Sequence, residues 1–507
     1  MSRVVVIGAG MGGLTCAARL AGQGHQVTVF EQADVVGGKL GRYERGTPEG
    51  LFRFDTGPGL LTLPQVFADF FAATGSTLDD ELDLVPLDPV VRHVFADGVV
   101  LDSSSDPAIF ADRVSTALGP VAAADWRRLW QRAARVWDTS WRHVLRSRVD
   151  SPLTLARLAW RVGDLAAIGP GRSLRGLGRS YLADQHLRTM LDRYATYTGS
   201  DPRRAPAALV AIPYAELAFG GWYLRGGLST LADAVLHRCE ALGVRIHTGC
   251  RVERIETAGG RTVGIRLAGG ERVGADLVVA NADAAAVYRD LLPTPRRARR
   301  LTERSIGGFV LLLGVKGRTP GLAHHTVFFP PVYDAEFDAL FHTGQPVADP
   351  TVLVTVADDP AVRPSGHEAW FVLVNAPTTV DWRAPGLADA YADQVLATLA
   401  RRGVDVRDRL LFREIRTPAD LETATLTPGG AIYGTPSHGL SGLLRPPNRG
   451  CVRGLYLVGG STHPGGGLPM VTLSAEIVAH TIDLSLERGA GRLGRRAGAG
   501  RDVRRGG

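Results

Sequence analysis

The chain has 507 residues, of which 45% are hydrophobic and 21% are charged, and its formal net charge is +7. This length exceeds what one hydrophobic core usually holds, so we expect two or more domains. The sequence contains no run of about 18 uninterrupted apolar residues, which argues against a membrane-spanning helix, and its four scattered cysteines form no C-x-x-C pair, which argues against a disulfide framework and a metal site.

The first predicted elements are a strand, a glycine-rich turn and a helix. Residues 3–7 are short, apolar and β-branched, which predicts a buried strand rather than a secretory signal. Gly8, Gly10 and Gly13 follow in the G-x-G-x-x-G spacing. This spacing suits a tight turn, the approach of a pyrophosphate to the backbone and close packing of helix on strand. We expect the amides that open a helix over 12–23 to face that pyrophosphate.

A second strand over 26–30 ends at Glu31, which stands 18 residues after Gly13. An acidic side chain in this position accepts hydrogen bonds from ribose hydroxyls, and it argues against NADP because it would repel the 2′-phosphate. The alternative is a glycine-rich turn without a ligand, which the strand, helix, strand and acid together disfavour.

The stretch "GGKLGR" follows directly and extends the nucleotide pattern. Gly37 and Gly38 let the chain turn back toward a cofactor, and Lys39 and Arg42 could bind its phosphates or face a flavin. An NAD site has no need of this extension, whereas many flavoproteins carry it. The alternative for the two cations is a solvated turn.

Four tryptophans recur at helical spacing in the middle of the chain, at positions 126, 130, 137 and 141, with seven arginines around them. Tryptophan beside arginine on one amphipathic helix is typical of a helix at a membrane surface. A stripe that faces the core, with a solvated basic face, explains the same spacing. The sequence leaves both open, and the basic stretch continues through Trp160 to Arg179.

Residues 454–474 read "GLYLVGGSTHPGGGLPMVTLS" and predict a strand over 455–458, a glycine-rich turn and a helix from about Met470. Backbone amides at such a turn can contact a flavin and its ribityl phosphate. The last segment, 487–507, holds seven arginines against two acidic residues and therefore carries most of the net charge. We expect it to be a disordered, solvated tail. Contact with anionic lipid is the alternative, and nucleic acid is a weaker one because no aromatic residue interleaves the arginines.

The C-terminal stretch resembles the signature of the bacterial carotenoid (phytoene) desaturase family of FAD-dependent oxidoreductases. Eight positions match that signature: Gly459, Thr462, His463, Pro464, Gly465, Gly467, Leu468 and Ser474. Gly466 departs from it, since the family usually has a small side chain there, and we expect little effect. The resemblance runs from about Arg3 to His480 and is weakest between about 90 and 200. The wider family includes amine oxidases and protoporphyrinogen oxidases.

The resemblance implies an α/β fold, in which a discontinuous Rossmann-like FAD-binding domain carries an inserted α+β domain that faces substrate or membrane. The expected cofactor segments are 1–95, 226–290 and 440–486. The inserts are 96–225, mainly helical, and 291–439, mainly strands, with "VLLLGV" and "AWFVLVNA" as strand candidates. The resemblance also adds cofactor residues to those above: Gly57, Val252 against the adenine, Gly459, Gly460, Gly467 and Leu468.

The implied reaction is the desaturation of a long polyene such as phytoene, in which hydride passes to FAD and a proton leaves the adjacent carbon. Quinone or oxygen would reoxidise the cofactor, and we expect a cytoplasmic protein that associates peripherally with the membrane. His463 could relay a proton, but a structural role in the glycine-rich turn is slightly favoured. Glu216 and Asp201 are weaker candidates, which we expect to be solvated or capping residues.

Three alternatives remain open from the sequence. One is a desaturase, isomerase or oxygenase of a hydroxylated or other carotenoid, because "GGKLGR" slightly resembles the hydroxycarotenoid desaturases. Another is an amine oxidase, which needs an aromatic cage beside the flavin. The last is a flavoprotein that binds polyene or membrane without turnover.

Overall fold

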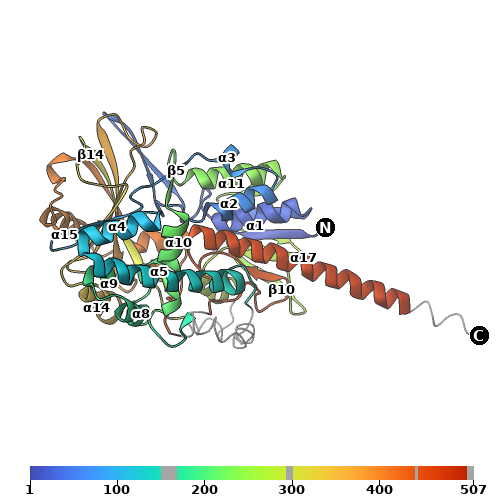
Figure 1. Cartoon of the computed structure of the whole chain (residues 1–507). Helices are drawn as coiled ribbons and strands as arrows, with labels where there is room; N and C mark the ends of the chain where they lie inside the picture. The colour runs from blue at the N-terminus through green and yellow to red at the C-terminus, as the bar shows by residue number, and fades with distance from the viewer. Residues whose placement is uncertain (150–167, 293–300, 440–443, 500–507) are drawn as a thin grey trace, which may run out of the picture.

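The computed structural model describes residues 1–149, 168–292, 301–439 and 444–499. Its first sheet has five parallel strands in the order β19-β13-β1-β2-β9 (Figure 1). These strands are β1 (Arg3–Ile7), β2 (Gln26–Phe30), β9 (Arg245–His247), β13 (Leu277–Ala280) and β19 (Leu455–Leu457). Segments from the beginning, middle and end of the chain therefore build one sheet, as a discontinuous Rossmann-like fold requires.

Both faces of this sheet are covered. Val4 and Val6 of β1 point into one apolar cluster, and the alternating Val5 and Ile7 point into another. The first cluster lies under α1 (Met11–Gly22), α2 (Pro64–Ala73), α11 (Thr230–Ala241) and α17 (Leu468–Ala499). The second lies under the antiparallel sheet of β10 (Val252–Ala258), β11 (Arg261–Leu267) and β12 (Arg272–Gly274).

A second, seven-stranded sheet has the order β18-β14-β17-β16-β15-β6-β7. Its strands are β6 (Arg92–Val94), β7 (Val100–Asp102), β14 (Gly307–Lys316), β15 (His325–Phe328), β16 (Val352–Val356), β17 (His367–Ala376) and β18 (Leu410–Arg416). The two predicted strands are confirmed as β14 and β17, and α15 (Leu387–Arg401) covers one face. The structure corrects one boundary: β6, expected in the cofactor segment 1–95, pairs with β15 in this sheet, where the resemblance is weakest and a three-residue strand gives little signal.

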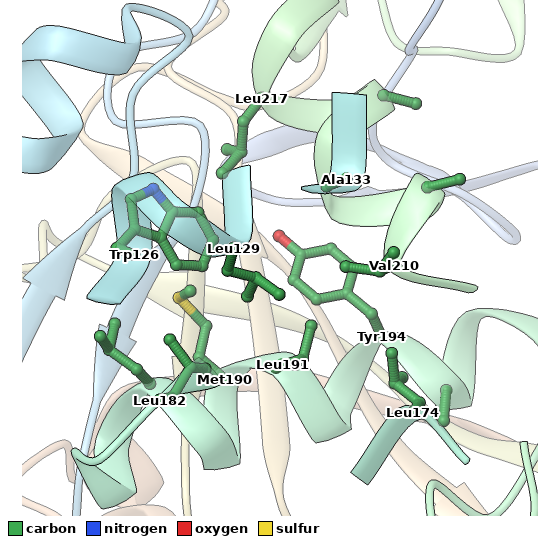
Figure 2. Packing of buried hydrophobic residues seen from close by; sticks show 14 of the residues in the cluster. Trp126, Leu129, Ala133, Leu174, Leu182, Met190, Leu191, Tyr194, Val210 and Leu217 are labelled. Atoms are coloured by element: carbon green, nitrogen blue, oxygen red, sulfur yellow. The ribbon is translucent and has the colours of Figure 1, made fainter. Parts of the chain in front are cut away.

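Helices predominate in the first insert, as predicted, and they pack beside the seven-stranded sheet (Figure 1). They are α4 (Pro107–Leu118), α5 (Pro120–Ser140), η1 (Trp141–Leu145), α8 (Leu174–Tyr181), α9 (Gln185–Arg193), η3 (Tyr194–Thr198), η4 (Ala207–Val210) and α10 (Ala211–Phe219). Figure 2 shows how Trp126 and Leu129 of α5 meet Met190 and Leu191 of α9 in their shared core.

The tryptophan stripe faces this core. Trp126 and Trp137 are only 3% and 9% exposed, and the Trp126 ring meets the Phe110 ring edge-on at 5.0 Å. Trp130 and Trp141 are half-buried against the same cluster, while Arg127 is exposed. The structure therefore favours the core-facing interpretation of the stripe. Trp160 lies outside the described residues.

The remaining elements are short connections: β3 (Arg42–Thr47), β4 (Gly50–Asp55), α3 (Leu78–Glu81), β5 (Leu84–Pro86), β8 (Trp222–Leu224), α12 (Ala284–Ala286), η5 (Val287–Leu291), α14 (Asp334–Asp338), η6 (Ala339–Thr343), η7 (Arg407–Arg409), α16 (Pro418–Thr425) and η8 (Pro428–Gly430). At the chain end, α17 continues to Ala499 and extends beyond the body of the protein (Figure 1). The expected disordered tail is therefore helical over 487–499, because a helix already formed is easily prolonged by arginine, leucine and alanine; the rest of it lies outside the described residues.

Candidate cofactor site

The three glycines of the N-terminal turn pack too closely for side chains. A Cβ atom on Gly13 would lie 2.0 Å from the Gly8 carbonyl oxygen, and one on Gly8, whose φ is +93°, would lie 2.8 Å from the carbonyl oxygen of Asn281. Gly10 precedes α1, so its peptide opens the helix. The free N–H groups and the dipole at this end of α1 favour a bound pyrophosphate.

Asn281 is a site residue that the sequence analysis missed. It follows β13, and its side chain reaches the glycine turn, where the amide oxygen can accept hydrogen bonds at 3.2 Å from the N–H groups of Gly10 and Gly13. A Cβ on Gly459 would also lie 2.7 Å from the Asn281 side-chain amide. The available signal was a polar residue directly after an apolar strand, at the carboxyl edge of a parallel sheet.

Glu31 lies at the carboxyl end of β2 and is 9% exposed. Its Oε2 atom accepts a hydrogen bond from the Ala9 N–H at 2.7 Å, and its Oε1 atom accepts one from the Ala33 N–H at 2.9 Å. Each carboxylate oxygen has a further lone pair, so the side chain is positioned and still able to accept from ribose hydroxyls.

Lys39 and Arg42 point to different places. The Lys39 Nζ atom donates to the carbonyl oxygens of Ala431 and Ile432 at 3.2 and 2.7 Å, and desolvation lowers its pKa to about 8 against the opposing influence of Asp283. Arg42 instead donates to the Asp233 carboxylate at 2.5 Å and remains half-exposed. Lys39 therefore departs fully from the alternative of a solvated turn, whereas the paired Arg42 side chain keeps part of its surface in solvent.

Arg42 and Gly57 line a cavity between the β3–β4 hairpin and the seven-stranded sheet. Gly57 passes so close to the Lys39 carbonyl oxygen that a Cβ would lie 2.0 Å from it. Residues His324 and Phe371, on the side of the seven-stranded sheet, form the opposite wall.

Val252 and Gly38 are two further predicted cofactor residues that lie beside the five-stranded sheet. Val252 is buried at the start of β10, in the apolar cluster that contains Phe30, and the Phe30 ring stacks on His247 at 5.1 Å. Gly38 approaches Gly10, since its Cβ position lies 3.1 Å from the Gly10 Cα atom. The "GGKLGR" stretch therefore lies against the G-x-G-x-x-G turn.

The C-terminal turn lies beside the N-terminal one. The Gly459 N–H donates to Ser474 Oγ at 3.3 Å, and α17 begins at Leu468 directly after Gly467, whose φ is +101°. The backbones of Gly460 and Gly466 pack closely, because a Cβ on Gly460 would lie 3.4 Å from the Gly466 Cα atom. Both glycine-rich turns therefore present backbone to one region.

The structure explains why Gly466 departs from the family signature. A Cβ on Gly466 would lie 2.5 Å from the Tyr433 Cδ1 atom. The Tyr433 ring occupies the space that a side chain would need, and the expectation that a glycine here does not hinder the cofactor stays a prediction. A sequence alone cannot show a contact between two residues of different turns.

The His463 side chain joins the C-terminal turn to the end of the tryptophan helix. It is 3% exposed, and its Nε2 atom lies 3.0 Å from the Val144 carbonyl oxygen and 2.8 Å from that of Ser147. A ring nitrogen that faces two carbonyl oxygens donates its proton. This geometry supports the structural role over proton relay.

The sequence analysis expected Glu216 and Asp201 to be solvated or capping residues, and the structure contradicts solvation for both. Asp201 Oδ1 accepts a hydrogen bond from the Arg203 N–H at 2.8 Å, which agrees with a capping role. Glu216 is 2% exposed and Asp201 is fully buried. Asp201 forms a salt bridge with Arg203 at 2.8 Å, whereas Glu216 accepts a hydrogen bond from the Tyr194 hydroxyl at 2.7 Å. Burial raises the pKa of Glu216. Single-residue patterns carry no signal for such long-range burial.

Comparison with known protein families identifies the family to which a chain with these two glycine-rich turns belongs. The family described as flavin containing amine oxidoreductase matches residues 11–483. The chain belongs to this family. Its members are FAD-dependent oxidoreductases, and this protein is one of them. The cradle of side-chain-free turns and the buried acid after β2 fit the pyrophosphate and ribose of that cofactor.

Curated relatives are similar over nearly the whole chain. A 4,4'-diapolycopene oxygenase of Methylomonas sp is 33% identical, covering 96% of this chain and 99% of its own. A phytoene dehydrogenase of Streptomyces griseus is 35% identical, covering 95% of each. A hydroxyneurosporene desaturase of Rubrivivax gelatinosus is 36% identical, covering 96% and 94%. An oxidoreductase structure from Methanosarcina mazei has a TM-score of 0.61 at 18% identity, covering 94% and 100%, and shows the same fold.

Proposed function

We propose that the protein desaturates a long polyene such as phytoene in carotenoid biosynthesis. The observation that carries this proposal is the similarity, over at least 94% of every chain compared, to relatives named for carotenoid desaturation or oxygenation. The desaturation of a hydrocarbon accounts for the FAD-binding fold and for the large apolar core of the helical insert beside it. Such a substrate needs no polar anchor at the reacting carbon.

In this reaction a polyene carbon loses a hydride, its neighbour loses a proton, and a new conjugated double bond forms between them. FAD supplies the acceptor of the hydride when it is bound. We propose that the chain contributes position and a dry environment for the carbon that becomes positively charged. We propose quinone or oxygen as the final electron acceptor.

A peripheral membrane location fits this substrate, because a hydrocarbon of about forty carbons must come from a bilayer. Within the described part of the chain, no helix is both long and apolar enough to cross a membrane. The basic arginines on the outer face of α5, among them Arg127 and Arg135, supply a surface that anionic lipid attracts. We propose this surface, and not the tryptophans, as the membrane contact.

The amine oxidase alternative requires a pair of aromatic rings that face each other beside the flavin. Tyr433 places one ring against Gly466 at the C-terminal turn, whereas such a cage needs a second ring that faces the first. A carotenoid with a hydroxyl or carbonyl group is the stronger second candidate, because relatives of comparable identity carry such names.

The test is expression in a bacterial host that accumulates phytoene, followed by pigment analysis. We expect coloured products with more conjugated double bonds than phytoene. The matched control is Glu31→Ala, which should accumulate to similar levels with less flavin and form less pigment. Unchanged phytoene beside a protein with a full complement of FAD would contradict the proposal.

A further inference from the structure

Two cations beside the glycine-rich turns have no acidic partner. Lys39 and Arg445 are half-buried, and neither forms a salt bridge with any residue in the described part of the chain. Charged side chains that leave the solvent are usually paired with an opposite charge. Arg445 also lies outside every sequence motif that predicted the cofactor site, so its place at the site is a result of the fold.

Hydrogen bonds place both cations on one short stretch of backbone. The Lys39 Nζ atom donates to the carbonyl oxygens of Ala431 and Ile432 at 3.2 and 2.7 Å. The Arg445 Nη1 atom donates to the carbonyl oxygen of the next residue, Tyr433, at 2.7 Å. Three consecutive carbonyl groups therefore hold the two cations, and carbonyl dipoles offset only part of a full charge.

Both cations also lie at the glycine-rich turns. The Arg445 Nη1 atom donates to the Gly460 carbonyl oxygen at 3.2 Å, and a Cβ on Gly465 would lie 3.2 Å from the Arg445 Nε atom. Lys39 belongs to the "GGKLGR" stretch, whose Gly38 lies against the N-terminal turn. The two positive charges are therefore located where the fold accommodates FAD.

The charge of the pair is only partly balanced. The Asp283 carboxylate favours the charged form of both cations through its electrostatic influence, but desolvation outweighs it. Desolvation lowers the pKa of Lys39 to about 8 and that of Arg445 to about 10. One acid at a distance does not compensate two desolvated cations, so this part of the site favours a bound anion.

The reduced ring of FAD is such an anion. The ring is neutral when oxidised, and a hydride brings it two electrons and one proton, so the reduced ring carries one negative charge until it takes up a second proton. The acid at Glu31 fits the ribose, and the amides that open α1 fit the pyrophosphate. The C-terminal turn, which Arg445 contacts, is left for the ring.

We propose that Arg445 and Lys39 stabilise the reduced, anionic form of FAD and thereby raise the reduction potential of the bound cofactor. The positive end of the α17 dipole, at Leu468, adds to their effect. A higher potential makes the FAD a stronger acceptor of a hydride from a C–H bond. The proposal concerns the cofactor, and it holds for whichever substrate the enzyme oxidises.

The experiment measures the reduction potential of FAD in the loaded enzyme, by equilibration with a reference dye and without any polyene. Arg445→Gln keeps a donor for the Tyr433 carbonyl oxygen but loses the charge, and Lys39→Gln does the same at its own carbonyl groups. Each should weaken the binding of reduced relative to oxidised FAD by about 10-fold, the size of one hydrogen bond to a charged group. For a two-electron couple this lowers the potential by about 30 mV.

Three controls separate charge from structure. Arg445→Lys keeps the charge and should keep most of the potential. Arg449→Gln removes an exposed arginine close by in the chain and should leave the potential unchanged. Glu31→Ala should weaken the binding of oxidised and reduced FAD by the same factor, because the charge of the ribose does not change on reduction.

An unchanged potential in folded Arg445→Gln and Lys39→Gln proteins would overturn the proposal. Equal weakening of oxidised and reduced FAD in these two variants would do the same and assign the cations to the pyrophosphate. If Arg445→Gln does not fold, Lys39→Gln beside the charge-retaining Lys39→Arg carries the test. Failure of the wild type to desaturate phytoene counts against the proposed function and not against this proposal, because the potential is measured without a polyene.

Discussion

The carboxylate of Glu31 is held by the Ala9 and Ala33 N–H groups at the point where β2 ends. Replacing Glu31 with alanine removes the acceptor for ribose hydroxyls, and a hydrogen bond to a charged group is worth about 1.5–3 kcal/mol. We therefore expect Glu31→Ala to raise the Kd for FAD about 10- to 100-fold. Flavin titration of the apoprotein measures this.

The control for that variant is Asp34→Ala, which removes a nearby acid that is exposed on the same turn. It should bind FAD like the wild type. Equal retention of flavin by Glu31→Ala and Asp34→Ala would remove Glu31 from the ribose role.

Gly466 and Tyr433 allow a second test at the residue scale. A Cβ at position 466 would lie 2.5 Å from the Tyr433 ring, so Gly466→Ala should lower the free energy of unfolding by about 1–3 kcal/mol through overpacking. Adding Tyr433→Leu should restore part of that loss. Urea denaturation measures both, and Gly269→Ala, where nothing lies within 4 Å of the new Cβ, should be close to neutral. A stable Gly466→Ala protein would show that the ring moves freely.

The sequence predicts site residues that belong to a motif of closely spaced positions. It does not predict site residues whose role depends on contacts with distant parts of the chain. The spacing of Gly8, Gly10 and Gly13 and the acid at 31 predicted a turn and a ligand position that the structure brings together. Asn281 was missed because its side chain reaches a turn about 270 residues earlier in the chain. The burial of Glu216 was missed for the same reason.

At the scale of elements, His463 connects the C-terminal turn to η1 through the carbonyl oxygens of Val144 and Ser147. Glutamine can donate a similar hydrogen bond, so His463→Gln should retain most polyene turnover, while His463→Phe should lose stability by about 1–3 kcal/mol. Thermal unfolding and pigment yield measure the two effects. A fall in turnover of 100-fold or more in a stable His463→Gln protein would indicate proton transfer instead.

The α5 helix carries the second test at this scale. Trp126 is 3% exposed and meets Phe110 edge-on, so Trp126→Ala should lower the free energy of unfolding by about 3–5 kcal/mol. Arg127→Ala, on the exposed face of the same helix, should change it by less than about 0.5 kcal/mol. If Trp126→Ala kept its stability but lost binding to anionic lipid vesicles, the tryptophan stripe would be the membrane contact after all.

Long, strongly patterned elements were predicted well, and short or terminal ones were not. The apolar runs of β1, β14 and β17 were recognised from the sequence and are present. The three residues of β6 are too few to show a period, and their pairing with β15 depends on backbone register across more than 200 residues. The helical continuation of α17 was missed because composition alone favoured disorder.

At the scale of the molecule, the two glycine-rich turns, from opposite ends of the chain, approach each other beside the five-stranded sheet, because a Cβ on Gly12 would lie 3.2 Å from the Gly459 Cα atom. The sequence predicted a discontinuous cofactor domain with inserts, because the resemblance covers the segments that form the five-stranded sheet. The strand order of the seven-stranded sheet could not be predicted from the sequence, because pairing between distant strands leaves no pattern within either strand.

The central claim is that FAD in this protein takes a hydride from a polyene. Anaerobic mixing of the FAD-loaded enzyme with phytoene tests it most directly. We expect the flavin absorbance near 450 nm to bleach, with about one new double bond formed for each flavin reduced. An unbleached flavin, with phytoene recovered intact from the same sample, would contradict the account.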